Sequence, residues 1–130
     1  MSLIFKTTTT NQEVLANGII PLTTISRRLG RTIQSSGDDI QLLAPNYYKV
    51  DASITFTAPV AGDVTIVLED NGIPVPGITA SLSATNTDTY TLNLTGIVRT
   101  FCCTGARTLN LVNASEVAIT TSNVAITVLD

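Results

Sequence analysis

The chain has 130 residues and a net charge of −3, and charged side chains make up 13% of it, against roughly a quarter in an average soluble domain. This length suits one domain with its own core, and no apolar run reaches the length of a membrane span. The charge balance argues against nucleic acid binding, which needs a broad cationic surface. The absence of histidine excludes a Cys–His nucleophile within one subunit.

The first third of the chain predicts extended structure interrupted by turns. Residues 1–17 are expected to form an extended N-terminal strand or arm of a single domain. A strand is expected over Ile19–Ser26, with Pro21 at a sheet edge because proline has no amide donor. Gly37–Asp39 predicts a turn, and Ile40–Leu43 predicts the next strand.

The clearest amphipathic strand runs from Tyr48 to Thr57, where every second residue is apolar. Pro59–Asp63 predicts a turn before a second alternating strand. Asn71-Gly72 predicts a type I′ hairpin, because both central residues of that turn need a positive φ. A further bend is expected at Val75–Gly77.

The last third continues the same pattern, with strands expected near Tyr90–Leu94, Ile97–Cys103, Arg107–Val112 and Val124–Leu129. No stretch longer than one turn predicts a helix. About eight to ten short antiparallel strands therefore indicate a sandwich or barrel. The predicted core consists of Tyr48, Val50, Ile54, Phe56, Val64, Ile66, Leu68, Leu92, Leu94, Leu109, Leu111, Ile119, Ile126 and Val128.

The residues that could carry chemistry form no recognisable site, and we expect no catalytic residue, no cofactor and no metal centre. The acid pairs Asp38-Asp39 and Glu69-Asp70 adjoin turns and are expected to be solvated. A Ca²⁺ site on Glu69, Asp70 and Asn71 is conceivable, but the acids lack the spacing of a calcium loop. The adjacent Cys102 and Cys103 are expected to be reduced and half-buried, since a bridge between neighbours strains the backbone.

The low charge indicates that part of the surface is covered in an assembly, although Thr and Asn alone could keep a monomer soluble. Tyr47 and Tyr48 are adjacent, so one ring points inward and the other outward, where it suits an interface or lies flat on an ordinary surface. Arg27, Arg28 and Arg31 are expected to pair with acids such as Asp38 and Asp39 across a strand or subunit boundary. The predicted contact residues are Phe5, Arg27, Arg28, Arg31, Tyr47 and Tyr90.

Three segments are distinctive: IIPLTTI at Ile19–Ile25, APNYYKVDASITF at Ala44–Phe56 and NGIPVPG at Asn71–Gly77. With the ending LNLVNASEVAITTSNVAITVLD, they resemble a group of small phage and prophage structural proteins from Gram-positive hosts. These are similar to jelly-roll domains of the complement-component and tumour-necrosis-factor superfamily, and to the C-terminal domain of collagen-like spore-surface glycoproteins. The resemblance implies an all-β jelly-roll sandwich that forms a compact homotrimer, with its inner sheets packed along the threefold axis.

The resemblance implies a non-enzymatic structural protein of a phage virion, a trimeric capsid decoration or head-surface protein. Its expected partners are its own copies and the major capsid protein or other virion proteins, with no nucleic acid and no membrane. No signal peptide is recognised, so the expected location is the virion surface after synthesis in the host cytoplasm. The alternative is a receptor- or glycan-binding tip module of a phage fibre or bacterial surface filament.

Overall fold

The computed structural model describes residues 1–85, 88–101 and 105–130, and these residues contain no helix. They form eleven β-strands, one more than the upper end of the predicted range. The strands are β1 (Leu3–Thr8), β2 (Gln12–Val14), β3 (Thr24–Leu29), β4 (Ile33–Ser36), β5 (Asp39–Leu42), β6 (Tyr47–Thr57), β7 (Gly62–Asp70), β8 (Ile73–Ala84), β9 (Thr89–Arg99), β10 (Arg107–Asn113) and β11 (Ile119–Leu129).

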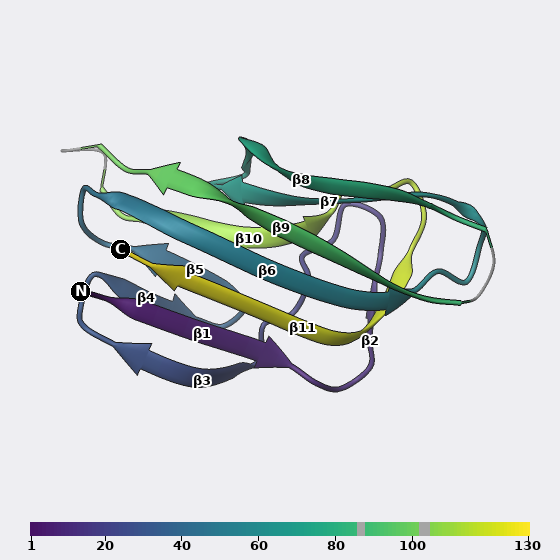
Figure 1. Ribbon diagram of the computed structural model, residues 1–130, viewed down its shortest axis with the longest axis horizontal. Coiled ribbons are helices and arrows are strands. Elements are labelled where there is room, and N and C mark those ends of the chain that lie inside the picture. Colours follow the sequence, from purple (N-terminus) through teal and green to yellow (C-terminus); the bar gives the residue numbers. More distant parts are fainter. Residues whose placement is uncertain (86–87, 102–104) are drawn as a thin grey trace.

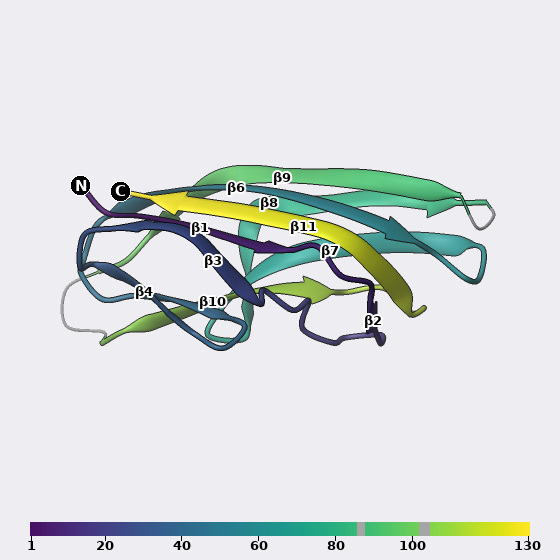
Figure 2. The ribbon, with the colours of Figure 1, turned by 90° about the horizontal axis from the view of Figure 1, so that it is seen from below.

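The strands form two antiparallel sheets that face each other (Figure 1). In the described residues, the front sheet has the order β3-β1-β11-β6-β9, and β2 pairs with the first residues of β11. The back sheet has the order β4-β5-β10-β7-β8. Figure 2 shows these sheets as two layers, with both ends of the chain side by side at one end of the sandwich. The predicted all-β jelly-roll sandwich is confirmed.

The core lies between the two layers, and every residue of the predicted core is buried. Period-two alternation explains this result, because successive side chains of a strand point to opposite faces. β6 shows it most clearly, since Tyr48, Val50, Ala52, Ile54 and Phe56 all point inward while the residues that alternate with them point outward. Tyr48 is fully buried, and its hydroxyl donates to the carbonyl of Ala44 (2.6 Å).

The hairpin between β7 and β8 forms as predicted, with φ of 50° at Asn71 and 83° at Gly72. The bend expected at Val75–Gly77 does not end a strand. β8 continues through this bend. Val67 pairs with Thr79 and Glu69 pairs with Pro74, so the residues of β8 between these two pairs form an irregularity at the sheet edge. Proline is tolerated there because β8 is the last strand of the back sheet.

The N-terminal segment is part of the front sheet. Residues 1–17 are expected to form either a strand or an extended arm. The structure places strands there, and β1 pairs with β3 on one side and with β11 on the other. The strand expected over Ile19–Ser26 is shorter than predicted and starts at Thr24. Before it, Ile19 bridges to Val112 on β10, and Ile20 and Leu22 are buried. This segment therefore crosses from one layer to the other instead of extending β3.

Candidate interaction surfaces

One end of the sandwich carries an arginine that contacts two aromatic rings. The guanidinium carbon of Arg99 lies 5.0 Å from the ring centroid of Tyr47 and 4.5 Å from that of Phe101. Tyr47 and Arg99 are direct partners across β6 and β9. Both contacts are within the range of cation–π attraction, so the two rings restrain the guanidinium.

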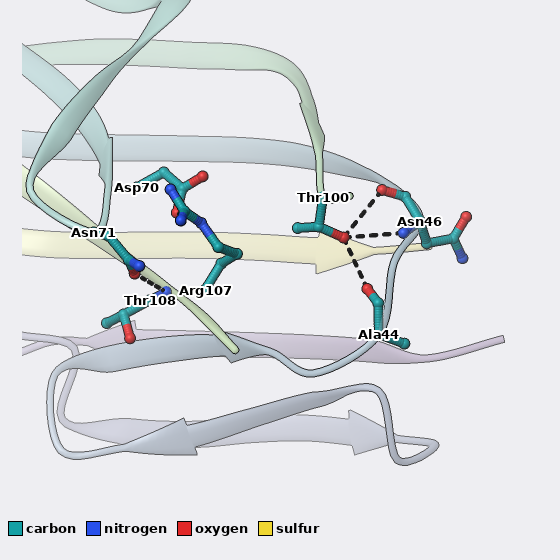
Figure 3. A network of polar contacts seen from close by, with 7 residues as sticks. All are labelled: Ala44, Asn46, Asp70, Asn71, Thr100, Arg107 and Thr108. Carbon is teal, nitrogen blue, oxygen red and sulfur yellow. Dashed lines mark hydrogen bonds and ion pairs between the residues drawn. The ribbon is translucent and has the colours of Figure 1, made fainter. Parts of the chain in front are cut away.

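Thr100 fixes the chain beside this arginine (Figure 3). Its hydroxyl accepts from the amide of Asn46 (2.9 Å) and donates to the carbonyl of Ala44 (2.8 Å), and its own amide donates to the carbonyl of Asn46 (2.9 Å). These bonds join the end of β9 to the loop before β6. These partly buried hydrogen bonds therefore fix the backbone next to Tyr47 and Arg99.

A half-buried ion pair closes the same end of the back sheet. The Nε of Arg107 donates to the carboxylate of Asp70 (2.9 Å), and the side-chain oxygen of Asn71 accepts from the amide of Thr108 (2.7 Å) (Figure 3). Both bonds tie the β7–β8 hairpin to β10. Asp70 and Asn71, two residues of the conceivable Ca²⁺ site, thus each accept a hydrogen bond from β10.

Exposed apolar side chains gather around these polar groups. Ile73 (66% exposed) and Ile97 (64% exposed) line the same open groove as Arg99 and Arg107. Leu43, Tyr47 and Phe101 are also largely exposed and line adjoining hollows. We call this surface the aromatic end, defined by Leu43, Tyr47, Ile73, Ile97, Arg99 and Phe101.

The outer face of the front sheet is hollowed at its centre. The central hollow is formed mainly by polar and small residues of β6, β9 and β11, with Phe5 of β1 at one side. Ser53 and Ala125 are direct partners across β6 and β11. The lining residues are Phe5, Asp51, Ala52, Ser53, Asn93, Leu94, Thr95, Ala125 and Thr127.

Charge on this hollow is compensated locally. Asp51 is its charged lining residue, and it accepts from the hydroxyl of Thr95 (2.6 Å). Lys49 lies 3.7 Å from the same carboxylate, and both side chains are about half exposed, so the pair contributes little to stability. Its effect is to leave a nearly neutral surface.

The predicted contact residues do not form one site. Phe5 borders the central hollow, and Tyr47, 57% exposed, belongs to the aromatic end. Tyr90 is on the inner face of β9, where its ring lies 6.0 Å from that of Phe56. Arg27, Arg28 and Arg31 lie on or just after β3, at the opposite edge of the front sheet from β9.

The acid pair Asp38-Asp39 has a structural role that differs from the prediction. Asp38 accepts from the amide of Leu22 (3.0 Å), and Asp39 accepts from the side-chain amide of Asn110. Neither acid is paired with an arginine within the described chain. Both are therefore hydrogen-bond acceptors at the predicted β4–β5 turn, where their side chains stay partly exposed.

The sequence reasoning missed a buried lysine. Lys6 points into the sandwich from β1 and is 1% exposed, and its ammonium donates to the hydroxyl of Ser35 and the carbonyl of Gly37 (both 2.6 Å). Burial lowers the pKa of Lys6, while the charges of Asp38 and Asp39 act in the opposite direction. The sequence indicates this burial only through alternation, because Lys6 is two residues from both Ile4 and Thr8, which are also buried.

A second polar group joins the two ends of the chain. Asp130 accepts from the amide of Ser2 (2.7 Å) and from the hydroxyl of Thr32 (2.9 Å). The amide of Ser2 is the main cause that lowers the pKa of Asp130, and the hydroxyl of Thr32 acts in the same direction. These bonds fasten the end of β11 to the start of β1 and to the turn between β3 and β4.

The remaining predicted features concern the cysteines, metal ligands and membrane spans. Cys102 and Cys103 lie outside the described residues. Within the described part of the chain, no group of three His, Cys, Asp or Glu side chains could hold a metal ion. No helix in the described ranges has the length and apolar character needed to cross a membrane.

No protein-family model matches the chain, and no curated protein matches it in sequence. Murine APRIL has a similar fold, with a TM-score of 0.70, 11% identity and 98% of each chain covered. The vertex protein P5 of PRD1 has a TM-score of 0.62 and 15% identity over 100% of this chain and 73% of that chain. The globular domain of zebrafish complement 1qA protein has a TM-score of 0.62 and 11% identity over 98% and 94% of the two chains.

At these identities the likeness is one of fold. The jelly roll of this chain is similar to those of murine APRIL, the PRD1 vertex protein P5 and the globular domain of zebrafish complement 1qA protein. One such fold hosts many functions, so the role of this chain has to be argued from its surfaces.

Proposed function

We propose that this chain is a non-enzymatic structural protein of a phage virion, which assembles as a homotrimer and decorates the capsid surface. The observation that carries the proposal is the outer face of the front sheet, where a neutral central hollow adjoins the exposed apolar side chains of the aromatic end. A face of this kind is costly to leave in water but suits burial against another subunit.

The two features differ in shape, which favours a ring of copies over a two-fold dimer. The central hollow is concave and lined mainly by polar and small residues, whereas the aromatic end presents large exposed side chains. A contact between two different patches is heterologous, and such contacts close into rings when the rotation allows. Three copies per ring is the number that the resemblance to the tumour-necrosis-factor superfamily implies.

The capsid role is supported by the fold of the PRD1 vertex protein P5, which covers the whole of this chain. A decoration protein acts by burying surface across neighbouring subunits and needs no reaction chemistry. We place the chain on the virion surface, after synthesis in the host cytoplasm, with the major capsid protein as its partner.

The solution mass of the purified chain tests the self-association step. We expect the mass of three chains, and we expect Ser53→Arg or Ala125→Arg to give monomers because each places a charged side chain in the central hollow. Ser81→Arg is the control, since Ser81 is exposed on β8 of the back sheet. Trimers in all variants would exclude the central hollow as the contact, and a wild-type monomer would exclude the assembly itself.

Co-sedimentation with capsids assembled without this chain tests the virion role. We expect the trimer to pellet with the capsids at a fixed ratio. A trimer that stays in the supernatant at all concentrations contradicts the decoration role and leaves the trimer result untouched.

The second candidate function is a glycan-binding tip module of a phage fibre or bacterial surface filament. Asn46, Tyr47 and Arg99 line one open hollow, and exposed aromatic and polar side chains of this kind bind sugars. A glycan array with the wild type and Tyr47→Ala separates the two functions. Saturable binding that Tyr47→Ala abolishes favours the tip module, and an array without binding rejects it.

A further inference from the structure

β3 is the most exposed strand of the front sheet. Five of its six residues are exposed, and only Ser26 is partly covered. β1 is its hydrogen-bonded neighbour, and among the described residues no strand pairs with its other edge. Alternate residues of an edge strand direct their N–H and C=O groups away from the sheet, so β3 offers a row of free backbone groups.

The other edge of the front sheet is covered. β9 lies beside β8 of the back sheet, and the side chain of Ile78 fills the space over Gly96. β3 is separated from β6 by β1 and β11, so it also lies away from the aromatic end and most of the central hollow. A partner can therefore reach β3 when the proposed trimer contact is occupied.

The free edge carries concentrated positive charge. Arg27 pairs with Phe5, whose side chain is on the outer face, and Arg28 pairs with the inward residue Ile4, so the two arginines point to opposite faces. Arg31 follows directly after the strand. In the described part of the chain, no carboxylate lies within 4.0 Å of any of these three guanidinium groups.

Apolar side chains accompany the arginines. Ile25 is 48% exposed and Leu29 is 57% exposed. They pair with Lys6 and Leu3, which point to opposite sides of the sheet, so each face of β3 presents an aliphatic side chain beside an arginine. Arg27 also donates to the carbonyl of Ser26 (3.0 Å), which holds its guanidinium close to the backbone.

We propose that the free edge of β3 binds an acidic, extended segment of a partner protein, which adds to the front sheet as a further strand. Main-chain hydrogen bonds to the free edge provide the attachment, and alternate side chains of the segment meet the two faces. Carboxylates on either face then reach Arg27 or Arg28, and Val or Thr side chains cover Ile25 and Leu29. The charge complementarity selects acidic segments over basic ones.

This inference rests on the proposed function only for the identity of the partner, which would be a capsid protein. Its test uses the purified chain and synthetic peptides and needs no capsid. The probe is an acetylated eight-residue peptide in which Glu alternates with Val and Thr. One control peptide has Lys in place of Glu, and a second has the Glu sequence with alternate backbone nitrogens methylated.

We expect the Glu peptide to bind at low salt and to protect backbone amides of β3 from hydrogen exchange, as seen by NMR. Binding should weaken about tenfold or more at high salt, because exposed charges are screened. The Lys peptide and the methylated peptide should bind at least tenfold more weakly. Charge reversal by Arg27→Glu with Arg28→Glu should exchange the preference, so that the Lys peptide binds and the Glu peptide does not.

The matched control is Lys49→Glu, which changes an exposed charge on β6 and should leave peptide binding unchanged. Equal binding of the methylated peptide would overturn strand addition. Equal binding of the Glu peptide to wild type and the double charge-reversed variant, with both folded by circular dichroism, would overturn the role of the arginines. Absence of any Glu peptide binding would also reject the inference and would indicate that the arginines only keep sheet edges apart.

Discussion

Gly96 is the residue whose replacement gives the sharpest test of the packing between the two sheets. Its φ is not in the left-handed region, so alanine is compatible with the backbone. A Cβ at this position, however, would lie 2.5 Å from Cγ1 and 2.8 Å from Cδ1 of Ile78, which is 1% exposed. We expect Gly96→Ala to cost about 1–3 kcal/mol through overpacking, offset by roughly 0.5–1 kcal/mol from the stiffer unfolded chain.

A double-mutant cycle isolates this contact. Ile78→Ala removes both atoms that meet the new Cβ and should itself destabilise by about 2–5 kcal/mol, because it leaves a cavity. In that background Gly96→Ala should be neutral or stabilising by roughly 0.5–1 kcal/mol. Urea unfolding of the four proteins measures the coupling. An equal cost of Gly96→Ala in both backgrounds would refute the packing explanation, because it would mean that Ile78 is not what excludes the methyl group.

Three further predictions concern buried and titrating groups. Phe56→Ala should destabilise by about 3–5 kcal/mol, since Phe56 is fully buried, and a loss below about 1 kcal/mol in urea unfolding would contradict its core position. The pKa of Asp130 is lowered in the fold, so its stabilisation is present above the unfolded pKa and is lost as pH falls through the folded pKa. Melting of wild type and Asp130→Asn should therefore converge in acid, and a constant difference from pH 6 to pH 2 would argue against these bonds. The pKa of Lys6 is lowered by burial, so the unfolded chain holds the extra proton between the folded pKa and the ordinary value, and stability should rise with pH across that window. Lys6→Met should remove this rise. If the stability of wild type and Lys6→Met depended on alkaline pH in the same way, the pKa of Lys6 would not be lowered by folding.

Local sequence signals predicted the faces of strands well. The alternation in β6 decides which side chains point inward, because side-chain direction in a strand depends only on the parity of the position. The Asn71-Gly72 turn was predictable for a similar reason, since the required φ values are a property of two residues. Both results follow from the conformations of neighbouring residues and need no knowledge of the rest of the chain.

Signals that depend on distant partners were not predictable. Nothing near Arg99 in the sequence indicates that Tyr47, on another strand, would stack on it. The aromatic end and the central hollow are assembled from strands that are far apart in the chain, and period-two alternation does not specify which strands become neighbours. Arg27, Arg28 and Arg31 were identified as a cluster, but the edge position of β3 became known only from the sheet order.

The sequence by itself determined that this is an all-β chain with a two-faced strand pattern, a low surface charge and no motif for catalysis. The tertiary structure decided where β1 lies, and therefore whether the side chain of Lys6 is buried. Alternation placed Lys6 on the inner side of its strand, but only the pairing of β1 between β3 and β11 buries it over Ser35 and Gly37. The physical reason is that side-chain direction is local, whereas burial depends on which distant segment covers the strand.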